Sequence, residues 1–288
     1  MTEEVSLFVT SNNQGICTLN HIAENAGLEI PTGWVLDNAT TIEINGLGET
    51  CTVQMIHPLK VTDPDRFVSL EKVNEKFKGE LPIPLAIGKK KLVMRHGQAG
   101  HNVSTATLNE SHDASLTSLG REQAINSGIA IYKHSGGHLS NLKAHCSDLL
   151  RTIETAELIL QQFPEDLRVD TCEVCIEAHE NTRAIGADHH WKKNDPLREI
   201  AIDPYVSLDK LELIAPTKTE EQRKKMRIEN LPKNDPIGNE SECIKRINGM
   251  KIDWSVYVAK LKKGYAEGKT FGQVASEKTL FEIIFEID

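Results

Sequence analysis

The sequence lacks the features typical of membrane proteins, secreted proteins and nucleic-acid-binding proteins. No apolar run approaches the roughly 20 residues that a membrane-spanning helix needs, and the polar start Met1 to Glu4 does not resemble a secretory signal. The six cysteines are therefore expected to be free thiols in a reducing, cytoplasmic setting. The net charge of -9 argues against a general nucleic-acid binder. We expect a cytoplasmic protein with neither nucleic acid nor membrane as partner, and its oligomeric state is left open.

The pair Cys172 and Cys175 has the spacing of a metal or redox motif, with His179 four residues further on. A structural zinc site, however, needs four close ligands with a recognisable second pair. Here that pair would have to come from histidines, whereas the alternation of a strand already accounts for apolar side chains in this segment. No metal and no cofactor are expected.

Alternating strand and helix patterns run from residue 90 onward, which favours an α/β domain. We expect a three-layer domain, with a mostly parallel sheet flanked by helices, over residues 86–288. A small α+β module is expected over residues 1–85, either as an accessory unit packed on that domain or as a substrate lid or docking surface. The polar, proline-punctuated stretch 188–238 predicts an elaborated loop or cap over the site. Expected strands are 5–10, 40–45, 51–56, 92–94, 142–146, 169–176 and 270–275, and expected helices are 18–26, 67–77, 117–132, 149–163, 241–263 and 278–285.

The triplet Arg95-His96-Gly97 follows the apolar run Leu92 to Met94, which predicts a strand that ends at a histidine. In open α/β sheets, ligands bind beyond the carboxyl ends of strands. Arg95 offers a permanently charged fork that suits phosphate oxygens. His96 is a nucleophile when it is neutral, and Gly97 lets the backbone approach a ligand closely.

The triplet begins a longer series of residues with regular spacing. Asn102 lies six residues after His96, and two further motifs follow it. The first consists of Asp113, Leu116, Thr117, Gly120, Gln123 and Ala124, and the second of Ser147, Leu149, Arg151, Thr155 and Ala156. In order and spacing the series resembles the histidine phosphatase superfamily, the phosphoglycerate mutase-like proteins, over residues 90–190.

The resemblance implies a phosphohistidine mechanism. His96 would attack phosphorus, and it would have to be accessible to its substrate. Arg95 and Arg151 would hold the equatorial oxygens, where charge must be neutralised in the transition state. Asn102 would donate a neutral hydrogen bond to the same group.

The leaving oxygen needs a proton from a carboxyl group. Members of the superfamily often carry a glutamate followed eight residues later by an aspartate, and Glu180 and Asp188 have this spacing. Glu177 is a nearby alternative. The acid is therefore expected to be Glu180, with Glu177 as its competitor.

The C-terminal region departs from the superfamily pattern. The superfamily places a second histidine at the end of its last core strand, but no histidine follows His190 here. The segment Val274 to Glu277 aligns with that strand, which puts Glu277 in the position of the second histidine. Two unit charges about 4 Å apart interact by about 4 kcal/mol at an effective dielectric of about 20, so an anionic Glu277 would repel phosphate. Protonation of Glu277, or a partner such as Arg95 or Arg151, would reduce that penalty.

Two hypotheses remain open from the sequence. The first is a phosphomonoester hydrolase acting through His96 on a phosphorylated small molecule or another phosphomonoester. The second is a catalytically impaired or repurposed homologue that binds a ligand or partner, or runs a different reaction. The retention of Arg95, His96, Asn102 and Arg151 favours the first, and Glu277 favours the second.

Overall fold

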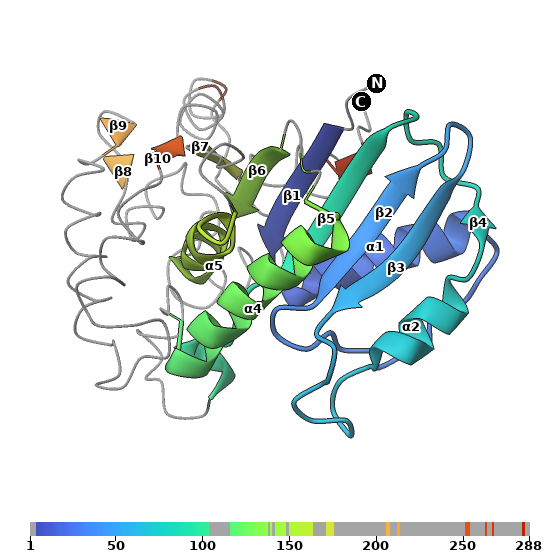
Figure 1. Ribbon diagram of the computed structural model, residues 1–288, viewed down its shortest axis with the longest axis horizontal. Coiled ribbons are helices and arrows are strands. Elements are labelled where there is room, and N and C mark those ends of the chain that lie inside the picture. The colour runs from blue at the N-terminus through green and yellow to red at the C-terminus, as the bar shows by residue number, and fades with distance from the viewer. Residues whose placement is uncertain are drawn as a thin grey trace.

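The computed structural model describes residues 4–103, 116–137, 139, 142–147, 150–163 and 171–175, together with the short segments 206–207, 212–213, 251–253 and 284–285 and the single positions 263 and 267. Within these residues, the fold is built on one eight-stranded sheet with the order β10-β7-β6-β1-β5-β2-β3-β4 (Figure 1). Its strands are β1 (Glu4–Thr10), β2 (Thr41–Gly46), β3 (Cys51–His57), β4 (Glu80–Leu81), β5 (Lys89–Arg95), β6 (Leu142–Ser147), β7 (Thr171–Cys175) and β10 (Lys251–Asp253). A separate two-stranded pair joins β8 (Val206–Ser207) to β9 (Glu212–Leu213).

Four of the seven strand pairings are parallel. They join β10, β7, β6, β1 and β5, whereas β5, β2, β3 and β4 pair antiparallel. The mixed α/β class and the parallel half of the sheet agree with the prediction from the sequence.

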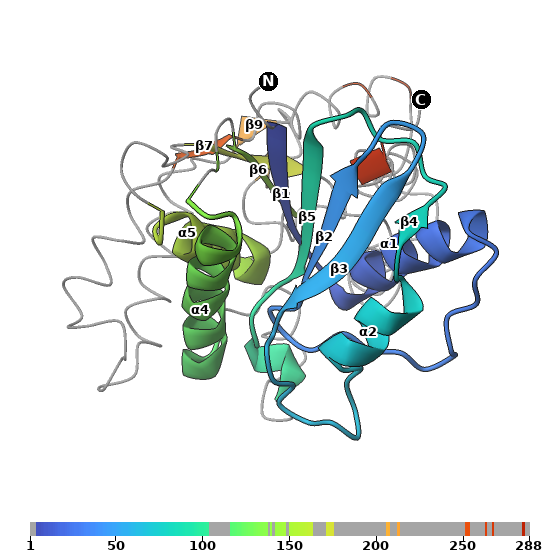
Figure 2. The same ribbon diagram turned by 45° about the vertical axis from the view of Figure 1, so that its right-hand side comes forward.

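Helices cover both faces of the sheet, as Figure 2 shows. On one face, α1 (Asn12–Asn25) and α2 (Leu70–Lys76) enclose a core that includes Phe8, Ile42 and Val93 from three adjacent strands. On the other face lie α4 (Ser118–His134) and α5 (Leu150–Leu160), which pack against each other. The short 3-10 helix η1 (Gly100–Asn102) follows β5. The three layers confirm the expected architecture.

The prediction that residues 1–85 form a module beside the catalytic domain does not match the sheet. β1 lies between β5 and β6, and β2 pairs with the other edge of β5. The boundary drawn after residue 85 therefore runs through one continuous sheet. Periodicity identified these strands correctly, but it carries no information on which strands become neighbours.

A second correction concerns the helix expected over residues 241–263. Residues Lys251–Asp253 form β10, which pairs in parallel with β7 and sets Ile252 opposite Cys172. The apolar positions that predicted a helix did not include Ile252, which is the middle residue of β10. The remaining positions of 241–263, apart from residue 263, lie outside the described part of the chain, as do most of 188–238 and of 270–285.

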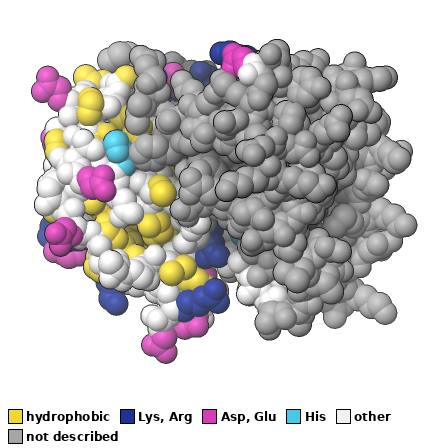
Figure 3. All heavy atoms as spheres, turned by 180° about the vertical axis from the view of Figure 1, so that it is seen from behind, with side chains coloured by type: hydrophobic (Ala, Val, Ile, Leu, Met, Phe, Trp, Pro, Cys, Tyr) yellow, Lys and Arg dark blue, Asp and Glu magenta, His cyan; other side chains and the backbone are white. Residues whose placement is uncertain are grey.

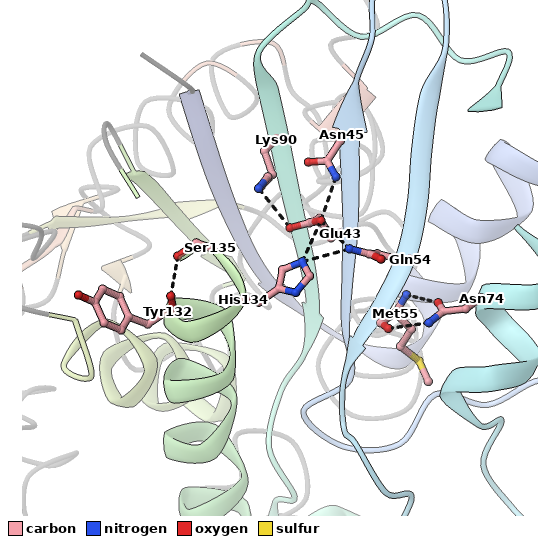
Figure 4. Close-up of polar contacts among 9 residues, drawn as sticks. All are labelled: Glu43, Asn45, Gln54, Met55, Asn74, Lys90, Tyr132, His134 and Ser135. Atoms are coloured by element: carbon pink, nitrogen blue, oxygen red, sulfur yellow. Dashed lines mark hydrogen bonds and ion pairs between the residues drawn. The ribbon is translucent and has the colours of Figure 1, made fainter. Parts of the chain in front are cut away.

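Two polar clusters fix the antiparallel half of the sheet (Figure 4). Glu43, which is buried on β2, accepts hydrogen bonds from Asn45 and Gln54 and lies 3.4 Å from Lys90 Nζ and 3.2 Å from His134 Nε2. Burial alone would raise the pKa of Glu43, but these hydrogen bonds and the charge of Lys90 lower it. Glu43 thus ties the end of α4 to the sheet as an anion.

The second cluster protects the backbone of β3. The side chain of Asn74 accepts a hydrogen bond from Met55 N at 2.6 Å and donates one to Met55 O at 3.1 Å (Figure 4). The Asn74 side chain thus pairs with both backbone polar groups of Met55. Met55 has no partner in β4, which is two residues long and pairs only with Cys51 and Thr52.

The surface of the described part carries mixed side chains. In the view from behind, apolar, acidic and basic groups are interspersed (Figure 3). Among the described residues, no helix has the length and apolar character needed to cross a membrane, and no group of three or more potential metal ligands is found.

Candidate active site

The site lies where β1, β5 and β6 end at one edge of the sheet. Thr10 and Arg95 are partners in the parallel register of β1 and β5, and His96 N donates a hydrogen bond to Thr10 O at 2.9 Å. β6 ends at Ser147, three residues before the start of α5. Because parallel strands present their carboxyl ends at the same edge, the Arg95-His96-Gly97 triplet and Arg151 come together there, as the sequence predicts.

The hydrogen bonds of His96 define its tautomer. Nδ1 lies 2.7 Å from Gly97 O, which can only accept, so Nδ1 carries the proton. Nε2 lies 3.2 Å from Nε of Arg151, which can only donate, so Nε2 holds the lone pair. His96 is therefore a neutral imidazole whose Nε2 lone pair is the nucleophilic position.

The exposure of His96 differs from the expectation of an accessible nucleophile. The residue is only 2% exposed, and Arg151 lies directly against Nε2. A phosphoryl group can reach Nε2 only after the guanidinium of Arg151 moves aside.

Arg95 is a buried cation with an unused donor. It is 6% exposed, one terminal NH group donates to Leu36 O, and the guanidinium carbon lies 5.8 Å from the centre of the Phe67 ring. Within the described residues, its Nε has no hydrogen-bond partner and no carboxylate forms an ion pair with it. Burial lowers the pKa of Arg95 to about 10, against the opposing charge of Asp37. Arg95 thus remains charged at neutral pH, and a buried cation of this kind suits an anionic ligand.

Arg151 is the second residue of α5 and is held by the residues around it. The hydroxyl of Thr152 donates to Ser147 O at 2.8 Å, which joins the first turn of α5 to the end of β6. Thr155 Oγ1 donates to Arg151 O at 2.7 Å and accepts from Gly97 N at 3.1 Å. The serine and threonine of the second motif therefore act through the backbone: they place Arg151 and join α5 to the residue that follows His96.

The first motif holds the backbone just after the triplet. Thr117 N and its hydroxyl donate to Gln98 O, and Gln98 N donates to Gln123 Oε1 at 2.9 Å. Thr117 also caps α4 by accepting from Gly120 N at 3.1 Å. These residues are positioning groups for the loop from Gly97 to Asn102.

Asn102 lies beside a segment that sequence reasoning did not connect to the site. This segment, residues 36–39, is called here the 36–39 loop. Asn38 Nδ2 lies 3.2 Å from Asn102 Oδ1 and 3.3 Å from His96 O, and Ala39 N donates to His96 O at 3.1 Å. Only the left-handed backbone at Ala39 (φ of 63°), which is unusual for a residue other than glycine, marks the loop as special. No motif in the sequence reveals it.

The other predicted site residues, Glu177, Glu180, Asp188 and Glu277, lie outside the described residues. Both edges of β5 are already paired, with β1 and with β2, and the backbone N of His96 is hydrogen-bonded to Thr10 O at the end of β1.

Comparison with known proteins agrees with this geometry. The sequence model of the histidine phosphatase superfamily (branch 1) matches residues 92–182, from β5 through β7. Over this segment the chain is similar to the histidine phosphatase superfamily, whose domain supports phosphatase-type or mutase-type activity in general. No curated protein and no solved structure matches the chain.

Proposed function

We propose that the protein is a phosphomonoester hydrolase that forms a phosphohistidine on Nε2 of His96. The observation that carries the proposal is the tautomer of His96: Gly97 O holds the proton on Nδ1, and the Nε2 lone pair points to a cation. A neutral imidazole fixed in this way is ready to attack phosphorus. Arg95, with its buried unused Nε, supplies the positive charge that a phosphate dianion needs.

The reaction has two steps. The Nε2 lone pair forms a bond to phosphorus while the bond to the ester oxygen breaks, and the leaving oxygen takes a proton from Glu180 or, in its place, Glu177. Water then attacks phosphorus, gives its proton to the same carboxylate, and releases inorganic phosphate as the N–P bond breaks. Arg95, Arg151 and Asn102 hold the phosphoryl oxygens in both steps. Arg151 turns from Nε2 to the entering phosphate, which frees the nucleophile only when substrate is present.

The proposed substrate is a phosphorylated small molecule or another phosphomonoester, handled in the cytoplasm without metal or cofactor. The burial of His96 favours a second candidate, a repurposed homologue that binds an anion without turning it over. The two differ in whether a covalent intermediate forms.

The test is to mix the protein with an aryl phosphate, quench rapidly, and search by mass spectrometry for one added phosphoryl group. A hydrolase should show phosphohistidine at His96 together with turnover, and His96→Ala should lose both. His134→Gln is the matched control, because this histidine lies on α4 and contacts Glu43. Binding of inorganic phosphate without a covalent intermediate would support the second candidate, and absence of both would overturn the assignment of this site.

A further inference from the structure

We propose that Asn38 is a positioning residue that fixes the amide of Asn102, so that its NH2 group faces the phosphoryl oxygens. This inference rests on the proposed function for the role of Asn102. The orientation itself follows from hydrogen bonds that do not depend on catalysis.

Two donors converge on the same atom of Asn102. Ala99 N donates to Asn102 Oδ1 at 3.0 Å, and Asn38 Nδ2 donates to it at 3.2 Å. Both donors require an oxygen at this position, because an NH2 group there would face two N–H groups. The Asn102 amide is thus fixed with Oδ1 toward the 36–39 loop and Nδ2 on the opposite side.

Asn38 is held firmly enough to impose this orientation. It is 4% exposed, its backbone N donates to Asp37 Oδ1 at 2.7 Å, and its side chain also reaches His96 O at 3.3 Å. Asp37 is in turn fixed by hydrogen bonds from Thr62 N and Thr62 Oγ1. A buried amide with its donors directed in this way has little freedom to flip.

The 36–39 loop contacts the three residues of the proposed phosphate site that precede α4 in the chain, namely Arg95, His96 and Asn102. Leu36 O accepts from the Arg95 guanidinium, and Ala39 N donates to His96 O. The strained backbone of Ala39 is fixed by that hydrogen bond and by Ser127 Oγ, which donates to Ala39 O at 3.3 Å. Backbone strain held by its surroundings is typical of segments that place functional groups. The 36–39 loop therefore couples Arg95, His96 and Asn102 in one arrangement.

A double-mutant cycle tests the inference with Asn38→Asp, Asn102→Ala and the combined variant. The carboxylate introduced by Asn38→Asp would place an acceptor where Asn102 Oδ1 needs a donor, so the Asn102 amide should flip or become mobile. For an aryl phosphate, we expect Asn38→Asp to lower kcat by about 100-fold, the lower end of the loss for a removed transition-state donor, with a smaller change in KM. If Asn38 acts through Asn102, the combined variant should match Asn102→Ala within about twofold. The proposal would be overturned if the kcat losses of the two single variants multiplied in the combined variant. Full activity in Asn38→Asp would also overturn it.

Two further measurements separate this inference from the proposed function. Asn38→Ala removes the donor without adding charge. If Asn38→Asp fails to fold, Asn38→Ala should still weaken the binding of inorganic phosphate. The side-chain amide resonance of Asn102, identified by its loss in Asn102→Ala, should shift in both Asn38 variants. If no phosphohistidine forms in the unmodified protein but this resonance and phosphate affinity still depend on Asn38, the hydrolase is refuted and the positioning role stands. An unchanged resonance would refute the positioning role alone.

Discussion

Gly97 and Gly120 meet through a backbone contact that leaves no room for a side chain on either residue. A Cβ on Gly97 would lie within 3.0 Å of Gly120 O, and a Cβ on Gly120 would lie within 3.0 Å of Gln98 O. The sequence suggested that Gly97 allows a ligand to approach. In the structure, its near neighbour is the first turn of α4.

Substitution at this contact should therefore destabilise the site. We expect Gly120→Ala and Gly97→Ala each to lower the free energy of unfolding by about 1–3 kcal/mol, the usual cost of overpacking, because backbone and not a flexible side chain blocks the new methyl group. Urea unfolding measures the change. Ser118→Ala, at an exposed position of the same helix turn, is the control. Unchanged unfolding midpoints for both glycine variants would contradict the tight contact.

Thr155 offers a sharper test of how α5 is joined to the triplet. Thr155→Val keeps the shape but removes the acceptor of Gly97 N, and a buried unsatisfied N–H costs about 1–3 kcal/mol. We expect this loss of stability together with reduced turnover, since Arg151 O also loses its donor. Thr155→Ser retains the hydroxyl and should stay close to the unmodified protein in both urea unfolding and kcat. Similar losses in the two variants would point to packing of the methyl group instead.

His57 should make the fold sensitive to acid. Burial lowers the pKa of His57 to about 4, with the charge of Asp37 opposing, and its Nδ1 has no hydrogen-bond partner within the described residues. The folded pKa lies below the unfolded value of about 6.5, so the unfolded chain binds the proton first. The contribution of neutral His57 to the free energy of unfolding is fully present above about pH 6.5. It is lost as the pH falls toward 4, by up to about 3 kcal/mol at 1.36 kcal/mol per pKa unit. Urea midpoints measured from pH 7 to 4.5 should fall less steeply for His57→Gln, and equal slopes would contradict the prediction.

The proton donor can be identified by the dependence on leaving group. Glu180→Gln should slow hydrolysis of alkyl phosphates far more than that of aryl phosphates, because a good leaving group needs little protonation. Glu177→Gln is the matched comparison, measured by kcat on the same two substrates. An equal loss on both substrate classes for Glu180→Gln, with a selective loss for Glu177→Gln, would transfer the role to Glu177.

Glu277 remains a predicted site residue whose effect is electrostatic. If its carboxylate lies near the phosphate, Glu277→His should raise kcat or tighten phosphate binding near neutral pH, because repulsion of about 4 kcal/mol at about 4 Å is removed. The activity of the unmodified protein should rise toward acidic pH, and Glu277→Gln should flatten that rise. If both substitutions leave rate and phosphate affinity unchanged, the pocket is completed from elsewhere, with the end of β1 beside His96 as the first place to examine.

Most described elements could be predicted from the sequence, because each carries its own local pattern. The strand expected over residues 51–56 is β3, and the helix expected over residues 117–132 is α4. The partners of β1 could not be predicted this way, since pairing depends on contacts between distant segments.

The same limit applied to the site. The Arg95-His96-Gly97 triplet and Arg151 were predicted from motif spacing, and the structure brings them together. Asn38 was missed, because it lies 58 residues before His96 and its importance comes only from the hydrogen bonds it makes after folding. The Gly97 to Gly120 contact was likewise hidden, since a single sequence does not show which backbone segments touch.

The central position of β1 sets an order on how this domain can be built during synthesis. β1 leaves the ribosome before both of its partners, β5 and β6, and its residue Val5 pairs with Leu142. Until those strands follow, only local pieces such as the β2–β3 hairpin can form, and the apolar residues Leu7 and Val9 lack their final environment. The phosphate site therefore cannot be completed before β6 and the start of α5 are translated, because β1 needs both β5 and β6 as partners.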